Sequence, residues 1–226
     1  MIDGGRKSTM QKLRAVVSWS GGKDCCLALH RSLDQFDIVG LITTMIEDGS
    51  RSRSHGLRSN LLMRQAESLG LQLFSEPSTW ESYEQAFERL LVRCKALDVS
   101  HVIFGDMYPD ANKEWAEIQC SKRGMVAVEP LWSEASEKVG REFLDIGASA
   151  VIVTVRDEKL DASFLGQQYS AELIEQFISM GIDPCVERGE FHTFVTSCPR
   201  FTDEIVIASQ GVHHEGGCSA LDLSLA

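Results

Sequence analysis

Short apolar runs alternate with segments of helical periodicity along the chain from Arg14 onward. The apolar runs predict strands at residues 15–18, 38–44, 71–75, 101–105 and 125–128. The segments between them predict helices at residues 23–33, 57–69, 83–97 and 112–122. Strands and helices that alternate in this way form a parallel sheet with right-handed crossovers and helices on both faces. We therefore expect an α/β fold with a doubly wound, Rossmann-like parallel sheet.

The pattern changes at Pro130-Leu131-Trp132, where the alternation is interrupted. Beyond this point we expect helices at 136–146 and 171–180, and strands at 150–155, 191–195 and 204–208. This half of the chain predicts a smaller α+β domain.

The domain organisation predicted from these patterns has four parts. They are a flexible leader at 1–12, an α/β domain at 13–130, a C-terminal α+β domain at 131–208 and a flexible tail at 209–226. The tail is rich in Gly, His and Ser, and chain ends of that composition are expected to fray.

Composition argues against several classes of protein. The formal net charge of −11 argues against a nucleic-acid partner, which needs Lys and Arg gathered on one face. The stretch Arg51–Arg58 (RSRSHGLR) is a candidate basic patch, and a solvated loop explains it equally well. No apolar run reaches the roughly 18 residues of a membrane span, and the cysteines form no CxxC pair. We expect a cytoplasmic protein with no membrane partner, and leave a homo-oligomer open.

The segment Ser18–Cys26 (SWSGGKDCC) carries the strongest chemical signal. It follows the first strand and opens a helix, which is where ligands bind in an open α/β sheet. Gly21 and Gly22 allow a sharp turn close to an anion, and the N–H groups of the helix start favour phosphate. Lys23 adds a cation, and Ser20 adds a hydroxyl donor. A helix start with two turn glycines and no ligand is the alternative interpretation.

Asp24 is unexpected beside a phosphate. A carboxylate there repels the phosphate unless Mg²⁺ or a fixed hydrogen bond intervenes, so Asp24 is a candidate Mg²⁺ ligand. The Walker pattern GxxxxGK[ST] and the dinucleotide pattern GxGxxG are both absent from the chain.

The SGGKD motif resembles that of the PP-loop, or N-type, ATP pyrophosphatases, which split ATP into AMP and pyrophosphate. The chain is most similar to their diphthine–ammonia ligase branch, over roughly residues 14–207. The motifs that carry this resemblance are Gly105-Asp106, Asp110, Glu117, Pro130-Leu131-Trp132 and the string GEFHTFV at Gly189–Val195. The resemblance implies a PP-loop ATPase type of fold, with ATP and Mg²⁺ bound at the loop. It makes residues 13–130 the expected nucleotide-binding domain and residues 131–208 the expected C-terminal substrate domain.

The resemblance and the local patterns together predict the following site residues. ATP is expected to contact Ser18, Ser20, Gly21, Gly22, Lys23, Asp24, Cys25, His55, Gly105 and Asp106. The second substrate is expected to contact Asp110, Glu117, Glu190, His192 and Thr193. Catalytic roles fall to Lys23, Glu190 and His192. Plainer interpretations remain open, since Asp110 could cap its helix and a polar outer strand face could account for Glu190 and His192.

Two positions depart from the family pattern. Cys25 stands where the family usually has serine, and a thiol is the weaker hydrogen-bond donor. Lys113 stands where the resemblance leads us to expect arginine, so the charge is kept and the bidentate fork is lost.

The resulting hypothesis is an ATP-dependent ligase that adenylates a carboxylate and then amidates it. Its partners would be ammonia or an amine and a carboxylate substrate, which could be borne on a protein. Lys23 and the loop amides would stabilise the departing pyrophosphate, and Glu190 and His192 would present or deprotonate the second substrate. The alternatives are a tRNA-modifying ATP pyrophosphatase and an ATP- or AMP-binding module without catalysis.

Overall fold

The computed structural model describes residues 12–185 and 189–226 and contains the expected parallel sheet. Its strands are β1 (Leu13–Ser18), β2 (Phe36–Met45), β3 (Gln72–Pro77), β4 (His101–Ile103) and β5 (Val126–Val128). They lie in the order β3-β2-β1-β4-β5, and every neighbouring pair is parallel. The prediction of an α/β, Rossmann-like sheet is confirmed.

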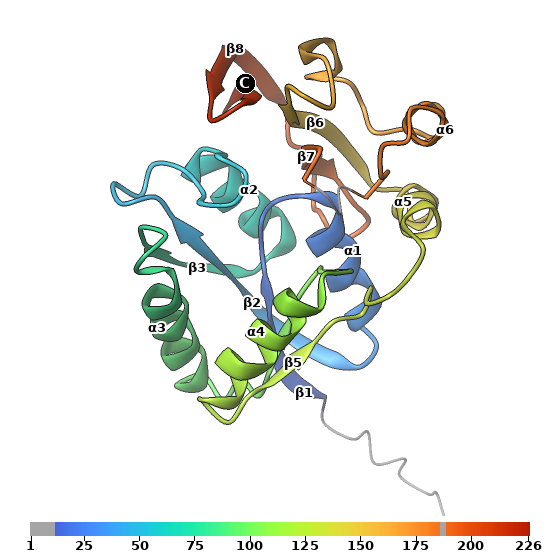
Figure 1. Ribbon diagram of the computed structural model, residues 1–226. Helices are drawn as coiled ribbons and strands as arrows, with labels where there is room; N and C mark the ends of the chain where they lie inside the picture. Colours follow the sequence, from blue (N-terminus) through green and yellow to red (C-terminus); the bar gives the residue numbers. More distant parts are fainter. Residues whose placement is uncertain (1–11, 186–188) are drawn as a thin grey trace, which may run out of the picture.

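Helices cover both faces of this sheet (Figure 1). They are α1 (Lys23–Ser32), α2 (Ser59–Leu69), α3 (Tyr83–Lys95) and α4 (Asp110–Ser121). The apolar stripe predicted from residue 83 onward is the buried face of α3, where Phe87, Leu90 and Leu91 pack with Ala116 of α4. Leu27 of α1 and Leu61 of α2 belong to a second cluster on the other face. The sheet therefore has a core on each side, as a doubly wound topology requires.

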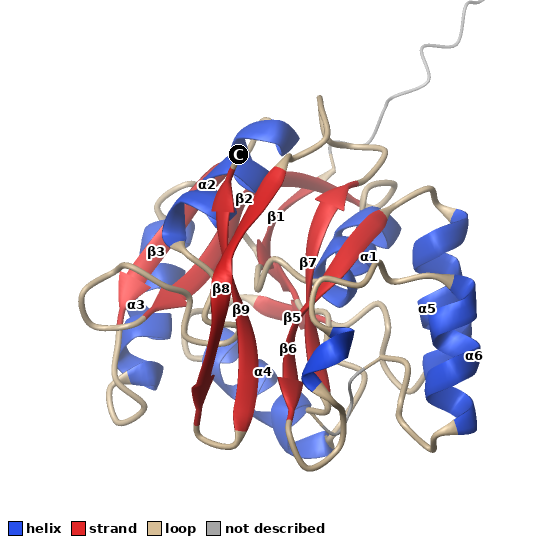
Figure 2. Ribbon diagram, turned by 90° about the horizontal axis from the view of Figure 1, so that it is seen from above, coloured by secondary structure: helices blue, strands red, loops and turns tan. Residues whose placement is uncertain are grey.

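The C-terminal half builds a separate antiparallel sheet. Its elements are α5 (Ser136–Asp145), β6 (Ser149–Arg156), the 3₁₀ helix η1 (Ala162–Phe164), α6 (Ala171–Ser179), β7 (Phe191–Ser197), β8 (Ile207–Glu215) and β9 (Cys218–Leu225). The strand order is β7-β6-β9-β8. Figure 2 shows α5 and α6 side by side at one edge of the molecule, with the β8–β9 hairpin beside β6.

The expectation of a flexible tail at 209–226 is wrong. Residues 207–215 and 218–225 form β8 and β9, and β9 pairs with β6 through Thr154–Arg156. Gly216 and Gly217 both have positive φ, 59° and 77°, and form the tight turn between the strands. The Gly-Gly pair between two extended runs was the available hairpin signal, and the polar composition obscured it. The strand expected at 204–208 accordingly begins at Ile207.

One hydrophobic cluster joins the two sheets. It contains Val17 and Leu41 from the parallel sheet, and Ile152, Phe191 and Phe194 from the antiparallel sheet, all of them fully buried. The two halves therefore share a core. The boundary between residues 130 and 131 stays a prediction, and the expected leader lies outside the described residues except for Lys12.

Candidate active site

The loop between β1 and α1 adopts a turn that requires its glycines. Gly21 has φ +87°, and a Cβ added there would lie 2.6 Å from Leu62 Cδ2. A Cβ on Gly22 would lie 2.9 Å from His55 Cε1 and 3.2 Å from the Thr193 carbonyl oxygen. Side chains at either position would push the loop away from the elements packed against it.

The C-terminal sheet holds this loop in place. Val195 of β7 donates its backbone N–H to the Gly21 carbonyl at 2.9 Å. The Lys23 N–H donates to Thr193 Oγ1 at 3.1 Å. Gln65, which is fully buried, donates to the carbonyls of Gly21 (3.0 Å) and Val195 (2.8 Å). The conformation of the loop therefore depends on a strand about 170 residues further along the chain.

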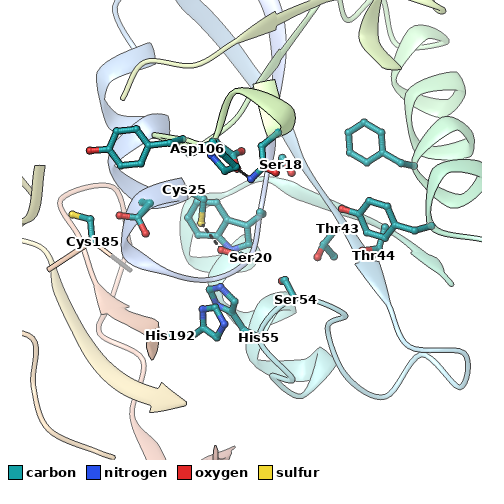
Figure 3. Close-up of a pocket in the computed structure, with 18 residues that line it drawn as sticks. Ser18, Ser20, Cys25, Thr43, Thr44, Ser54, His55, Asp106, Cys185 and His192 are labelled. Atoms are coloured by element: carbon teal, nitrogen blue, oxygen red, sulfur yellow. Dashed lines mark hydrogen bonds between the residues drawn. The ribbon is translucent and has the colours of Figure 1, made fainter. Parts of the chain in front are cut away.

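A cavity of about 440 Å³ opens where β1, β2 and β4 end, beside this loop. Figure 3 shows His55 and His192 on one side of it and Asp106 and Ser18 on the other. Of the predicted residues, those that line it are Ser18, Ser20, Asp24, Cys25, His55, Gly105, Asp106 and His192. Ligands of doubly wound sheets bind at this edge.

Other predicted residues lie elsewhere. Gly21, Gly22 and Thr193 shape the loop from behind the cavity. Asp110 is the first residue of α4, after an N-cap at Pro109, and both Asp110 and Glu117 are exposed on that helix outside the cavity. Glu190 is 2% exposed, just before β7. Substrate roles for Asp110, Glu117 and Glu190 stay predictions.

Lys23 is buried, with 1% of its side chain exposed. Its Nζ donates to both carboxylate oxygens of Asp24 at 2.9 Å and lies 5.7 and 5.6 Å from the ring centroids of Tyr169 and Phe191. Burial raises the pKa of Asp24, and the Lys23 charge opposes that rise. The fixed hydrogen bond that a carboxylate needs beside a phosphate is thus supplied by the neighbouring residue.

Cys25 faces both the cavity and its own loop. Its Sγ donates to the Gly22 carbonyl at 3.1 Å and accepts a long hydrogen bond from Ser20 Oγ at 3.5 Å. Burial raises the pKa of the Cys25 thiol, so the reactive thiolate is disfavoured. Cys25 therefore fits the loop as a small packing residue.

The two histidines of the cavity stack on each other. The ring centroids of His55 and His192 are 4.2 Å apart with 23° between the planes. Burial lowers the pKa of His192 to about 4, with smaller contributions from Lys23 and Arg156. Burial also lowers the pKa of His55, with His192 and Lys23 adding to the effect. Both imidazoles are therefore neutral at pH 7, and His55 Nδ1 has no hydrogen-bond partner among the described residues.

Asp106 lines the same cavity as Asp24. It accepts a hydrogen bond from Asn112 Nδ2 at 3.1 Å. Burial raises the pKa of Asp106, and the charge of Asp24 raises it further. A carboxylate whose ionisation is disfavoured by burial and by a second carboxylate would be stabilised by a nearby cation. Within residues 12–185 and 189–226, no cluster of three or more His, Cys, Asp or Glu side chains could hold a metal ion by itself.

Sequence models of the diphthamide synthase N-terminal domain and C-terminal domain match residues 13–127 and 135–221. The chain belongs to the diphthamide synthase family. The resemblance to the diphthine–ammonia ligases expected from the motifs is confirmed. None of the helices in the described part of the chain is long and apolar enough to cross a membrane.

The curated relatives are named diphthine–ammonia ligase. The protein from Rattus norvegicus is 24% identical over 92% of this chain and 88% of its own length. The protein from Schizosaccharomyces pombe is 25% identical over 88% of this chain, which spans only 37% of that longer relative. A solved structure described as a predicted subunit of tRNA methyltransferase from Methanocaldococcus jannaschii covers 85% of this chain and 100% of its own, with 14% identity and a TM-score of 0.45.

Several residues that line the cavity of this protein were not predicted from the sequence. The missed residues include Thr43 and Thr44 at the end of β2, Tyr83 and Phe87 on α3, and Cys185. The two threonines end a predicted parallel strand, and that position was a usable signal. Tyr83 and Phe87 belong to an apolar stripe that indicated only a core. Nothing in the local sequence marks Cys185, which a long connection brings to the cavity.

Proposed function

We propose that this chain is an ATP-dependent ligase that adenylates a carboxylate and amidates it with ammonia or an amine. The observation that supports the proposal most is the SGGKD loop bordering a polar cavity in a chain that both family models match. The relatives named diphthine–ammonia ligase make diphthine, a carboxylate borne on a protein, the first substrate to test.

ATP fits the shape and chemistry of the cavity. Its volume of about 440 Å³ suits a nucleotide. Ser18 and Ser20 offer hydroxyl groups near the loop (Figure 3). Tyr83 and Phe87 of α3 also line the cavity and offer aromatic faces for a base. The helix start at Lys23 favours the phosphates between these two regions.

The reaction proceeds in two displacements. A substrate carboxylate oxygen attacks the α-phosphorus of ATP, and the bond to the bridging oxygen of pyrophosphate breaks. The nitrogen of ammonia or an amine then attacks the acyl carbon, loses a proton, and displaces AMP. Positioning and charge neutralisation supply most of the catalysis in such steps.

Lys23 supports this chemistry through its ion pair with Asp24. Neutralised by the Lys23 ammonium, the carboxylate of Asp24 can lie beside phosphate with little repulsion. Asp24 and Asp106 both line the cavity, and their carboxylates would hold Mg²⁺. The ion would neutralise phosphate charge.

The neutral histidines suit the second displacement. An uncharged imidazole has a lone pair that can accept the proton lost by the attacking nitrogen. His192 and His55 lie together in the cavity wall, and either ring can serve as the acceptor. Glu190 is buried immediately before β7. Its role would be to orient the start of β7 rather than to contact solvent.

The experiment is a product assay with ATP, Mg²⁺, ammonium and a panel of carboxylates that includes diphthine-bearing elongation factor. We expect AMP and pyrophosphate in equal amounts, and loss of turnover of about 100-fold in Asp106→Asn. ADP as the product would overturn the proposal. ATP binding without turnover on any acid would favour a binding module, and a salt-dependent complex with tRNA would favour a tRNA-modifying enzyme.

A further inference from the structure

The loop between β2 and α2 carries one wall of the cavity. Ser54 and His55 lie at its tip and face the cavity. Its two shoulders, Arg51 and Arg58, form an isolated antiparallel bridge with each other. Arg51 Nη1 also donates to the Gly56 carbonyl at 2.9 Å. The tip is therefore a closed turn, and its place in the cavity depends on what holds the shoulders.

Both shoulders are held by one carboxylate in the C-terminal hairpin. Arg58 donates to Asp222 Oδ1 from Nε at 2.9 Å and to Oδ2 from Nη2 at 2.5 Å. Arg51 Nη2 donates to the same Oδ1 at 2.8 Å. The Asp222 side chain is only 21% exposed, and the two guanidinium groups hold its pKa far below the usual range. A bidentate, shared carboxylate of this kind is a strong and directional contact.

Asp222 belongs to the sheet that also carries His192. The sheet order is β7-β6-β9-β8, with His192 in β7 and Asp222 in β9. The loop thus contacts one antiparallel sheet both through the Asp222 ion pairs and through the His55–His192 stack. The basic stretch 51–58 also finds an explanation here, because the guanidinium groups of Arg51 and Arg58 face a carboxylate of their own chain.

We propose that Asp222 is a positioning residue: it fastens the 51–58 loop to the C-terminal sheet so that His55 stays stacked on His192 in the cavity. The inference rests on the proposed function only in taking this cavity as the catalytic one. Without the Asp222 carboxylate, two like charges would face each other across the loop shoulders and drive them apart. The His55 ring would then leave His192, and both rings would become more hydrated.

The pKa values of His55 and His192 report the position of the 51–58 loop directly, and measuring them requires no turnover. The groups that act on His55 are His192, Lys23 and the Thr193 backbone, and those that act on His192 are Lys23 and Arg156. Asp222 is not among them, so a change in its charge alone would leave both titrations in place. A shift in Asp222→Asn therefore reports movement of the loop.

The experiment compares Asp222→Asn, Asp222→Glu and Arg58→Lys with a matched control, Asp203→Asn. Asp203 pairs with Arg64 of α2, so the control removes an ion pair to the C-terminal half that does not involve the 51–58 loop. Histidine ring NMR of the ligand-free protein should show both pKa values rising by about one in Asp222→Asn. Asp222→Glu should restore part of the change, and the control should match the wild type.

Turnover gives a second measurement. We expect kcat/KM to fall about tenfold in Asp222→Asn and Arg58→Lys, with partial recovery in Asp222→Glu. Titrations in a folded Asp222→Asn protein that overlay the wild type would overturn the proposal. If Asp222→Asn does not fold, Arg58→Lys, which keeps the charge and loses the fork, decides by the same titration. A wild type without ligase activity would contradict the proposed function and leave this titration test intact.

Discussion

Gly105 lies two residues after the end of β4, with its α-carbon against the loop between β1 and α1. A Cβ at this position would lie 2.7 Å from the Cys25 nitrogen and 2.8 Å from the Asp24 carbonyl carbon. Both neighbours are backbone atoms, so a side chain rotation cannot relieve the clash. The glycine therefore allows the chain after β4 to approach the start of α1. This approach brings Asp106 and Asp24 to the same cavity.

Gly105→Ala should therefore displace the loop and weaken ATP binding by about tenfold or more, while the protein stays folded. Isothermal titration calorimetry with ATP measures the loss. Gly49→Ala is the control, because no atom lies within 4 Å of the added Cβ. Its positive φ of 72° predicts a small loss of stability with unchanged ATP affinity. Equal affinities in wild type and Gly105→Ala would show that the loop is not the ATP site.

His192 should make stability depend on acid pH. Its pKa of about 4 in the folded chain lies below the ordinary 6.5, so the unfolded state binds more protons between these values. The contribution of His192 to the free energy of unfolding should be complete above pH 6.5. It should fall by up to about 3 kcal/mol as the pH drops to 4.

Urea unfolding at several pH values measures this fall. Asp24 and Asp106 have raised pKa values and act with the opposite sign, so the comparison is with His192→Asn. His55, whose pKa burial also lowers, contributes a slope of the same sign. The variant should therefore lose only part of the slope between pH 6.5 and 4. Parallel curves for the two proteins would contradict the expectation.

At the scale of elements, the strands and helices of the first half were predictable because each has a strong local cause. α2 ends at Gly70, which has φ 67° and caps the helix in the left-handed conformation. β2 is a long apolar run between covered faces, and α3 has an apolar stripe. β8 was not predictable in this way, since its side chains are mostly exposed and its pairing with β9 is what defines it.

The β8–β9 hairpin should be required for a stable fold. Removal of residues 207–226 exposes the edge of β6 and deletes Asp222, so the loop with His55 loses its ion pairs. We expect a lower melting temperature and aggregation, measured by circular dichroism and light scattering. Asp203→Asn in the full-length chain serves as the control for loss of a single ion pair. A truncated protein that melts like the full chain would contradict this role.

At the scale of the whole molecule, the two sheets depend on each other. Val17 and Phe194 share one hydrophobic cluster. The loop between β1 and α1 accepts one hydrogen bond from β7 and donates another to it. Buried Gln65 ties the loop, Trp19 and β7 together through its amide. A part of the chain that contains only the parallel sheet would lose these partners.

We expect the full chain to unfold in one cooperative transition, with equal calorimetric and van't Hoff enthalpies. A fragment of residues 12–130 should show no cooperative melt and no ATP binding, because its apolar face and the loop carbonyl of Gly21 lose their cover. Differential scanning calorimetry distinguishes the cases. Two separate transitions in the full chain would show two independent domains.

The amino-acid sequence by itself determined the parallel sheet, the turn with two glycines between β1 and α1, and membership of the family, which short motifs are enough to indicate. These features depend on local periodicity and on residue types at fixed spacing. Tertiary structure decided that Lys23 pairs with Asp24 rather than facing the cavity, and that His55 stacks on His192. It also decided that Arg51 and Arg58 pair with Asp222, which lies 171 and 164 residues further along the chain. Such partners come together only when two sheets share a core, and no local pattern records that packing.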